Sequence, residues 1–333
     1  HVAIVGSGSG AFAAAIRAAE NGARVTIIEA GTIGGTCVNV GCVPSKILIR
    51  AAHIAHHAAH HPIAGLTRTT LPLDNRARVA QQQERVTELR RAKYENILET
   101  NPSINLVRGH ARFVDAHTLA IARADGTEIT LGADRFLVAT GASAVIPNVP
   151  GLKETPCWTS AEALVAEQIP KQLIVFGGSV VAVELAQAYA RLGSRVTLIA
   201  RSTLLSKEDP ALGEGLKAAF EAEGLRVLTN ADVKAVRYTN GAFTVTTGSE
   251  NVTGERLLVA SGRAPNTRAL DLERAGVTTD ARGAIVVDDH LRTNIAHIYA
   301  AGDCTDQPQF VYVAAAAGTR AAVNMTGGNA VLD

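Results

Sequence analysis

Two cysteines with four residues between them, Cys37 and Cys42, have the types and spacing for redox chemistry. On a regular helix the two side chains would point about 140° apart, so a disulfide between them requires locally irregular backbone. Pro44 gives a reason for irregular backbone or for a helix start. A helix running on from Pro44 would place Cys42 near its positive end, and Lys46 adds a cation; both favour a thiolate. The segment therefore predicts a pair of redox-active thiols.

On the sequence alone, two alternatives to a redox pair stay open. The cysteines could be buried structural residues or half of a zinc site. Zinc sites usually have a second Cys or Cys/His pair at close spacing, whereas the remaining cysteines, Cys157 and Cys304, are isolated. We predict that Cys157 is structural and that Cys304 is a small buried thiol.

A strand, a glycine turn and a helix precede the thiol pair, in the order typical of dinucleotide binding. The strand is expected over residues 1–5, the helix to about Asn21, and a second strand from Arg24 to Ile28, followed by Glu29. Backbone at the turn can approach a pyrophosphate at the helix N-terminus, and Glu29 can accept hydrogen bonds from ribose hydroxyls. The alternative is an ordinary strand-turn-helix. The turn residues assigned to the cofactor are Gly6, Gly8, Gly10 and Ala11.

A second unit of the same kind begins at the strand Gln172–Phe176 and continues through a helix to Arg191 and a strand over Arg195–Ile199. It departs from the glycine fingerprint at Ser179, where a second glycine is expected. A serine still permits fairly close approach of backbone to a ligand. We therefore predict a second dinucleotide site here.

The second unit ends its strand on a different charge. Where the first has Glu29, the second has Ala200-Arg201-Ser202, with no carboxylate for a ribose. Arg201, assisted by Lys207, suits a 2′-phosphate; the alternative is a solvated arginine at a strand end. Two folds with opposite charge at this position predict two different dinucleotide ligands, the second one with a 2′-phosphate.

The run from Gly35 to Lys46 resembles the active site of the flavoprotein disulfide reductases, and the resemblance covers essentially the whole chain. Leu137–Gly141, Leu258–Asn266 and Ile298–Asp303 resemble that family's crossing and flavin-closing segments. The resemblance implies an α/β fold with two Rossmann-like domains, as in glutathione reductase. The FAD-binding domain would be discontinuous, 1–150 plus 265–333, with the NADPH-binding domain at 151–264 and the family's C-terminal interface domain absent.

The family also implies roles for the thiols. Cys42 would lie nearest the flavin and form the charge-transfer thiolate, and Cys37 would meet the substrate. Lys46 would lie near the flavin, steadied by Glu184, and Val180 stands where some relatives have a tyrosine gate. The flavin site would further include Gly35, Thr36, Lys46, Thr140, Gly141, Gly302 and Asp303; the NADPH site would comprise Gly177, Ser179, Val180, Glu184, Arg201, Lys207 and Gly262.

Within the family, the mercuric reductases are the most similar, on the strings Ala300–Tyr312 and Lys46–Ile54. They reduce Hg(II), presented as a thiol complex, and Cys37 and Cys42 would ligate it as substrate, since soft thiolates suit a soft ion. Two alternatives remain. One is a disulfide reductase of the glutathione or dihydrolipoamide type, and the other is a fragment with only diaphorase or NADPH oxidase activity.

Composition limits the partners. The net charge of +1 gives no electrostatic case for nucleic acid or a membrane surface, and no apolar run is long enough to span a bilayer. Four cysteines with one reactive pair favour the reducing cytoplasm. The chain begins on a strand without Met, so we expect a piece of a longer protein. Full-length relatives would be homodimers, and this chain without its interface domain a monomer.

A cluster of histidines lies on the first of two helical stretches expected between Ile47 and Thr100, which a loop near Pro62–Leu73 joins. Spacings of three and four residues align imidazoles on one helical face, which could bind a divalent ion. More often such a face is solvated and partly charged. The members are His53, His56, His57, His60 and His61.

Overall fold

The structure, a computed structural model, describes residues 1–332, and the chain divides into two compact units. Unit 1 comprises His1–Asn39, Val86–Ser143 and the chain from Ala264 on. Unit 2 comprises Val40–Arg85 and Ala144–Arg263. Both are α/β units built on a parallel sheet, which confirms the expected fold class.

Unit 1 is built on a five-stranded parallel sheet in the order β17-β7-β1-β2-β3. Its central strand β1 is buried on both faces and pairs with β2 and β7, as the apolar run predicts for a strand inside a parallel sheet. The strands are β1 (Val2–Val5), β2 (Val25–Glu29), β3 (Ile104–Arg108), β7 (Arg135–Val138) and β17 (Ile298–Ala300).

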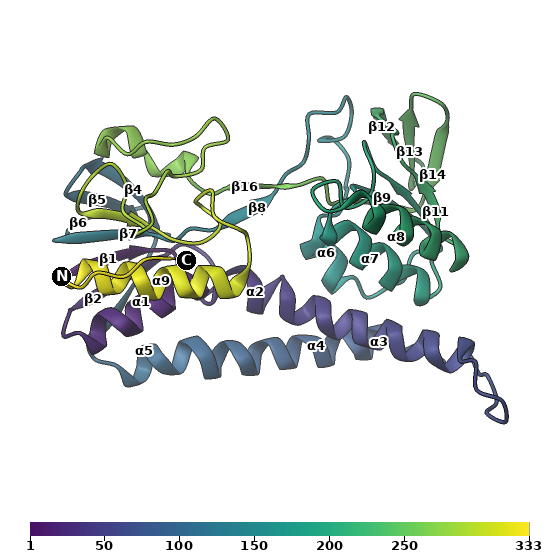
Figure 1. Cartoon of the computed structure of the whole chain (residues 1–333), viewed down its shortest axis with the longest axis horizontal. Coiled ribbons are helices and arrows are strands. Elements are labelled where there is room, and N and C mark those ends of the chain that lie inside the picture. Colours follow the sequence, from purple (N-terminus) through teal and green to yellow (C-terminus); the bar gives the residue numbers. More distant parts are fainter. Residues whose placement is uncertain (333) are drawn as a thin grey trace. The chain divides into compact units, whose positions relative to one another are not determined.

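The two faces of this sheet have different cover (Figure 1). Helices α1 (Ser9–Glu20) and α9 (Val311–Met325) pack together below it in the view of Figure 1. On the other face lies the antiparallel sheet of β4 (His110–Asp115), β5 (Thr118–Ala122) and β6 (Glu128–Gly132). Phe113 of this small sheet shares a core with Ala3 and Val5 of β1. The face toward β4–β6 therefore carries alternate residues of β1, as strand geometry requires.

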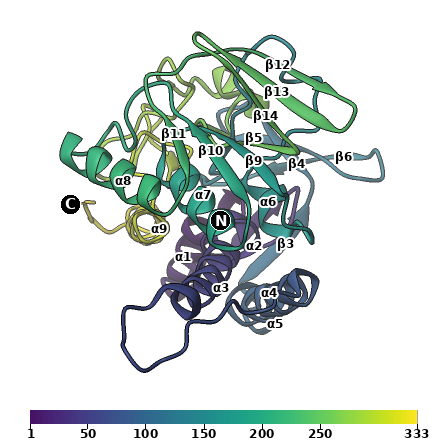
Figure 2. The same cartoon turned by 90° about the vertical axis from the view of Figure 1, so that its right-hand side faces the viewer.

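Unit 2 repeats this arrangement with a four-stranded parallel sheet in the order β11-β10-β9-β15 and a three-stranded antiparallel sheet beside it (Figure 2). The parallel strands are β9 (Gln172–Phe176), β10 (Arg195–Ile199), β11 (Arg226–Leu228) and β15 (Arg256–Val259). The antiparallel strands are β12 (Val233–Thr239), β13 (Ala242–Thr247) and β14 (Asn251–Gly254). The helices are α3 (Cys42–His60), α6 (Ser160–Val165), α7 (Val180–Arg191) and α8 (Pro210–Ala222).

By contacts, residues 40–85 pack with unit 2, although they were expected in the domain that begins with residues 1–150. The reason is that α3 packs against α7, with Leu48 and Ala52 buried in the same core as Leu185 and Tyr189. The inserted segment is 144–263 by contacts, where 151–264 was expected.

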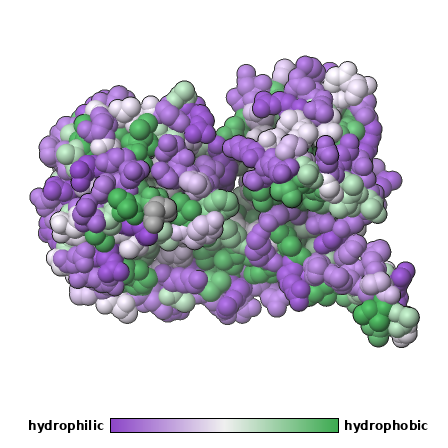
Figure 3. Space-filling view, viewed as in Figure 1, coloured by the Kyte–Doolittle hydropathy of each residue, from purple (hydrophilic) through white to green (hydrophobic). Residues whose placement is uncertain are grey.

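Two helical stretches follow the thiol segment, as expected. The first is α3, and the second runs through α4 (Asn75–Arg90), a one-turn π-helix (Arg91–Glu95) and α5 (Asn96–Thr100). Between α3 and α4 the chain forms a loop whose apolar side chains Ile63, Leu66, Leu71 and Leu73 are exposed. Green surface at the end of this loop is visible at the lower right of Figure 3.

The remaining elements are short: α2 (Gly35–Asn39), β8 (Ala142–Ala144), β16 (Arg263–Pro265) and 3-10 turns at Arg268–Leu270 and Leu272–Ala275. Within residues 1–332, none of the helices combines the length and the apolar character needed to cross a membrane.

Candidate dinucleotide and dithiol sites

The glycine turn of unit 1 is shaped by close backbone contacts. Gly6 has φ +106°, and a Cβ at this position would lie 2.4 Å from the carbonyl oxygen of Ala139. Gly35, with φ +67°, approaches Gly8 so closely that its Cβ would lie 2.7 Å from the Gly8 Cα. The turn leads into Ser9, the first residue of α1. In general, the free backbone N–H groups in the first turn of a helix can bind a phosphate or pyrophosphate group.

Four of the parallel strands end at this turn's edge of the sheet. After β1 come Gly6 and Gly8, and β2 ends on Glu29. Thr140 and Gly141 follow β7, and Gly302 and Asp303 follow β17. Since β17, β7, β1 and β2 are consecutive parallel neighbours, their carboxyl ends lie along one edge. Ligands of open α/β sheets bind at this edge.

The carboxylate of Glu29 is held in place by two donors. Ser7 Oγ donates to Oε2 at 2.6 Å, and the Gly31 N–H donates to Oε1 at 2.6 Å. Ser7 is almost fully buried, and its Oγ also accepts from the Gly34 N–H at 3.2 Å. Ser7 was not predicted as a site residue, because it occupies a variable position of the glycine fingerprint. Its hydroxyl fixes the acid that would meet a ribose.

Gly10 has a different role from Gly6 and Gly8. A Cβ at Gly10 would lie 2.9 Å from the Ala314 carbonyl oxygen, and one at Gly318 would lie 2.0 Å from the Gly10 carbonyl oxygen. Gly10 therefore permits the close packing of α1 on α9. Ala11 is likewise fully buried in α1. The structure gives these two residues a packing role.

Thr140 presents an unusual polar atom. Its Oγ1 is buried and forms no hydrogen bond of normal geometry. It interacts only weakly with the Cys304 thiol. A buried hydroxyl of this kind is costly unless a ligand or water completes its bonding. Its position after β7, at the carboxyl edge of the sheet, fits a bound dinucleotide.

The backbone is irregular between the two cysteines, as their spacing predicts. Cys37 lies half-buried in α2, which ends at Asn39, and the exposed Cys42 is the first residue of α3. Gly41, with φ −128° and ψ −118°, breaks the helix between them. Cys42 thus stands at the positive end of a helix of 19 residues. The helix begins two residues earlier than Pro44.

Asn39 secures the short helix that carries Cys37. Its Nδ2 donates to the carbonyl oxygens of Ile33 at 2.8 Å and Gly35 at 2.9 Å, and its Oδ1 accepts from Arg90 Nη1 at 3.1 Å. The exposed Thr36 lies in the same turn. Neither Asn39 nor Arg90 was singled out from the sequence, because the two residues lie about fifty positions apart.

Lys46 and Glu184 form an ion pair, as expected. The Lys46 ammonium, four residues into α3 from Cys42, donates to Glu184 Oε1 of α7. The lysine side chain is 59% exposed, so the pair adds little to stability. Its geometry does keep a cation one helical turn from Cys42.

The glycine turn of unit 2 has the same construction. Gly177 has φ +145°, and a Cβ there would lie 2.2 Å from the Ala260 carbonyl oxygen. Ser179, which precedes α7, has extended backbone and donates from Oγ to the same oxygen at 3.1 Å. Its hydroxyl therefore points to the backbone that follows β15. Val180 follows as an exposed residue, and Gly262 lies two residues beyond Ala260.

The segment after β10 comes back to this turn. The Leu205 N–H donates to the Gly178 carbonyl at 2.8 Å, and a Cβ at Gly178 would meet the Thr203 carbonyl oxygen at 3.3 Å. Arg201 and Lys207, both exposed, flank this contact in sequence. Lys234 chiefly, and Arg201 to a smaller extent, lower the pKa of Asp232. Arg201 therefore lies near the Lys234–Asp232 ion pair.

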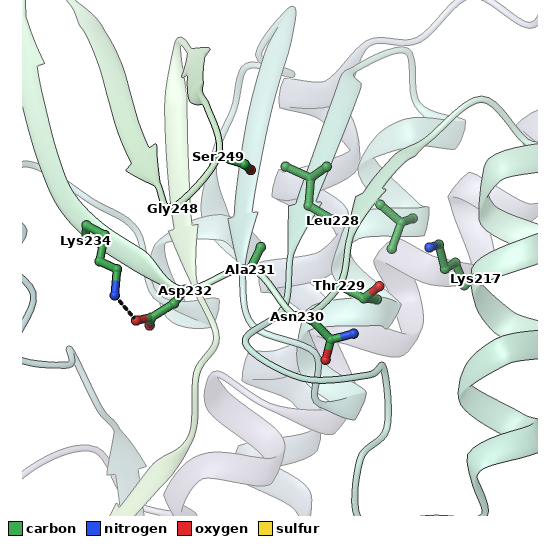
Figure 4. Close-up of a pocket in the computed structure, with 10 residues that line it drawn as sticks. Lys217, Leu228, Thr229, Asn230, Ala231, Asp232, Lys234, Gly248 and Ser249 are labelled. Carbon is green, nitrogen blue, oxygen red and sulfur yellow. Dashed lines mark hydrogen bonds and ion pairs between the residues drawn. The ribbon is translucent and has the colours of Figure 1, made fainter.

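A cavity of about 500 Å³ lies beyond the end of β11 (Figure 4). Thr229, Asn230 and Asp232 line it, and Lys234 pairs with Asp232 at its margin. None of the residues expected at a dinucleotide or thiol site lines this cavity.

The histidines of α3 form two contacting pairs. His53 meets His57 edge-on at 4.2 Å between ring centroids, and His56 stacks on His60 at 4.4 Å. Burial, with the charges of neighbouring groups, lowers the pKa values of His53 and His56. His61 caps the end of the helix. Within residues 1–332, three or more His, Cys, Asp or Glu side chains nowhere gather closely enough to hold a metal ion.

The two isolated cysteines are poorly placed for thiolate chemistry. Burial raises the pKa of Cys304 to about 11, and its Sγ donates to the Val138 carbonyl oxygen at 3.3 Å. Burial also raises the pKa of the half-buried Cys157. Both results agree with the structural roles expected for them.

Two glycine turns of the dinucleotide-binding type lie on separate parallel sheets, and a pair of cysteines follows β2 of the first sheet. These features define a class of protein. A family model described as pyridine nucleotide-disulphide oxidoreductase matches residues 1–318, and the chain belongs to this family.

Two curated relatives of high identity are mercuric reductases. The chain is 59% identical to a mercuric reductase of Shigella flexneri over 338 residues, covering 100% of this chain and 60% of the relative. A mercuric reductase of Acidithiobacillus ferrooxidans is also 59% identical, with 100% and 61% covered. The chain therefore spans about three fifths of the length of the curated relatives it matches.

Solved structures agree with the fold. A Cu(II) complex of RclA, a HOCl-induced flavoprotein disulfide reductase of Escherichia coli, has a TM-score of 0.88 and 29% identity. The match covers 98% of this chain and 71% of that chain.

Proposed function

We propose that this chain is the catalytic core of an NADPH-dependent, FAD-containing mercury(II) reductase. The observation that carries the proposal is the contrast between two glycine turns of the same construction. One strand ends on the anchored carboxylate of Glu29, and the other leads to the guanidinium of Arg201. Hg(II) as substrate rests on the 59% identity to mercuric reductases over the whole chain.

The residues of unit 1 fit FAD. The N-terminus of α1 suits the pyrophosphate, and Glu29 suits the adenosine ribose. The buried Thr140 hydroxyl could form a hydrogen bond with a polar group of the cofactor. Asp303, after β17, would hold the ribityl chain, as the family resemblance implies. Gly141 and Gly302, with φ values of +67° and +78°, allow the tight turns at this edge.

The residues of unit 2 fit NADPH. The Gly177 turn and the N-terminus of α7 would hold the pyrophosphate, and Arg201 with Lys207 would hold the 2′-phosphate. Val180 leaves a small side chain at the first position of α7, where a tyrosine gate would otherwise stand. Gly262, with φ +149°, lets the chain turn after β15.

The chemistry that FAD supplies when bound is the relay of an electron pair from NADPH to a disulfide. The protein's part is the Cys37–Cys42 pair, whose S–S bond takes up two electrons and two protons to give two thiols. Cys42 is favoured as a thiolate because it begins α3, and Lys46 adds positive charge one turn away. Cys37, the other thiol, would meet the substrate first.

Both thiolates would then ligate Hg(II), delivered as a complex with small thiols. The net reaction consumes one NADPH and one Hg(II) and gives NADP⁺, a proton and Hg(0), and the protein thiols are regenerated. Soft sulfur ligands suit this ion. Because such a pair must be reducible in the cell, we place the protein in the cytoplasm.

The test measures NADPH oxidation with Hg(II) and excess thiol, with glutathione disulfide or lipoamide as competing substrates. We expect Hg(II)-dependent oxidation and mercury volatilisation, lost in both Cys37→Ser and Cys42→Ser. In the NADPH-reduced protein, Cys42→Ser should abolish long-wavelength charge-transfer absorbance, whereas Cys37→Ser should retain it. Preference for a disulfide substrate would assign the chain to the disulfide reductases. NADPH oxidation only by oxygen or dyes would mean that the chain has diaphorase activity alone.

Light scattering on residues 1–333 tests the prediction that this chain is a monomer.

A further inference from the structure

The helical rod formed by α4 and α5 is interrupted by one π-turn at Arg91–Glu95. The Asn96 N–H bonds to the Arg91 carbonyl, five residues back, in place of the usual four. Turns of this kind make up well under 1% of residues and occur often at functional sites. Two side chains here, Arg90 just before the π-turn and Tyr94 within it, contact elements of the proposed flavin and thiol site.

The insertion brings Arg90 and Glu95 together. In an α-helix, side chains five positions apart point about 140° away from one another. Here Arg90 Nε donates to Glu95 Oε1 at 3.1 Å, and Arg90 Nη1 donates to Asn39 Oδ1 at 3.1 Å. The Arg90 side chain is only 24% exposed. The Arg90 guanidinium therefore donates one hydrogen bond to the Glu95 carboxylate and another to the Asn39 side chain.

Asn39 links this guanidinium to the thiol segment. Its Nδ2 closes α2 by donating to the Gly35 carbonyl, and it also ties α2 to Ile33. Cys37 lies in the middle of this five-residue helix, which is too short to be stable without such contacts. The position of Cys37 thus depends on Asn39, and the orientation of Asn39 depends on Arg90.

Tyr94, a residue of the same π-turn, contacts the start of α1 next to the glycine turn of unit 1. The ring is 8% exposed and packs edge-on against Phe12 of α1 at 4.9 Å. Its hydroxyl lies 3.2 Å from Ser9 Oγ at the start of α1. The ring also fills the space beside Gly34, where a Cβ would lie 2.9 Å from Tyr94 Cδ2.

We propose that the π-turn at Arg91–Glu95 is a positioning element of the reductase site. Tyr94 orients Ser9 at the pyrophosphate-binding end of α1, and Arg90, acting through Asn39, sets the position of Cys37. This inference rests on the proposed function, since it takes the α1 N-terminus as the FAD site and Cys37 as a redox thiol. A single π-turn would thereby help to position both the start of α1 and Cys37.

The first test measures FAD binding by flavin fluorescence, a readout independent of turnover. Tyr94→Phe removes only the hydroxyl, so we expect the Kd for FAD to rise about three- to tenfold, the usual cost of one hydrogen bond. Tyr238→Phe, an exposed tyrosine of β12, is the matched control and should leave the Kd unchanged. An unchanged Kd in Tyr94→Phe contradicts the role given to Tyr94.

The second test follows alkylation of each cysteine in reduced, FAD-free protein by peptide mass spectrometry. Arg90→Gln should make Cys37 react about fivefold faster or more, because α2 loses its anchor, while Cys157 serves as an internal reference for general loosening. Arg91→Gln, an exposed arginine of the same turn, is the control. If Arg90 acts through Asn39, the double variant Arg90→Gln/Asn39→Ala should match Asn39→Ala alone.

Failure of this inference and failure of the proposed function are distinguishable. An unmutated chain that does not bind FAD overturns the proposed function and, with it, the inference. If the unmutated chain binds FAD, and Cys37 reacts at the same rate in Arg90→Gln and Arg91→Gln, the positioning role of Arg90 is wrong. Equal acceleration of Cys37 and Cys157 would likewise contradict it, since it would mean that the variant loosens the whole protein.

Discussion

The two glycine turns have nearly the same backbone but lead to opposite charges. Gly8, with φ −75° and ψ −175°, and Ser179, with φ −78° and ψ 171°, precede helices of 12 residues each. Gly6 and Gly177 both press against the backbone after a neighbouring strand. The charges near the strand ends then differ: β2 ends on Glu29, whereas Arg201 lies two residues after the end of β10. Under the proposed function, the shared backbone geometry would set where each dinucleotide lies, and the charged residue near the strand end would select which one binds.

The largest effects should come from filling the glycine turns. Gly6→Ala places a methyl group 2.4 Å from the Ala139 carbonyl oxygen, so FAD binding should fall more than a hundredfold while NADPH binding persists. Gly177→Ala should give the opposite result, measured by titration of each ligand.

Gly193→Ala is the matched control for these variants. Gly193 has the same φ of +106° as Gly6, but a Cβ there would have no neighbour within 4 Å. It should lower the free energy of unfolding by about 1–2 kcal/mol without affecting either ligand. Simultaneous loss of both ligands in Gly6→Ala would show that the two turns are not independent sites.

Reversing the charge at the second strand end should have the next largest effect. Arg201→Glu removes a charge-assisted contact worth about 1.5–3 kcal/mol, so the preference for NADPH over NADH should fall roughly ten- to a hundredfold. The measurement is the ratio of kcat/KM for the two nucleotides. Arg195→Glu, at the opposite end of β10, should leave the ratio unchanged. Equal use of NADH and NADPH by the unmutated chain would contradict the assignment of Arg201.

Releasing the carboxylate of Glu29 should have a moderate effect. Ser7→Ala removes the 2.6 Å hydrogen bond to Glu29, so the Kd for FAD should rise about fivefold, with NADPH binding unchanged. Ligand titration of the purified protein measures both constants. A Kd for FAD equal to that of the unmutated chain would show that the Gly31 N–H alone is enough to hold Glu29.

Exchanging serine and glycine between the turns should have the smallest effect. Ser179 Oγ turns to the Ala260 carbonyl, and a Cβ at Gly8 would have its nearest neighbour at 3.9 Å. Ser179→Gly and Gly8→Ser should therefore change their ligands' Kd values less than about threefold. A tenfold tighter Kd for NADPH in Ser179→Gly would mean that the serine obstructs the pyrophosphate.

Local patterns made much of this architecture predictable. Each strand-turn-helix unit was predicted because strand burial, glycine turns and helix starts are encoded within about thirty residues. The ion pair of Lys46 with Glu184 was expected from the family resemblance and is confirmed.

Long-range contacts account for the features that residue patterns did not predict. The packing of α3 with unit 2 depends on contacts between Leu48 and α7, more than a hundred residues away. The bonds from Ser7 to Glu29 and from Arg90 to Asn39 depend on side-chain orientation, which residue spacing does not reveal. The π-turn has no sequence signature, since it inserts one residue into an otherwise ordinary helix.

The packing of α1 on α9 has a consequence for synthesis. The face of α1 that carries Gly10 is covered by a helix that begins about 300 residues later in the chain, and β7 gains its neighbour β17 about 160 residues after its own synthesis. At ribosomal rates of about 5–20 residues per second, roughly 15–60 s separate the two helices. Unit 2 ends at Arg263, so its contacts can form before those of unit 1 are complete. The nascent chain would thus complete unit 2, the proposed NADPH-binding unit, first, and would complete the proposed FAD-binding unit last.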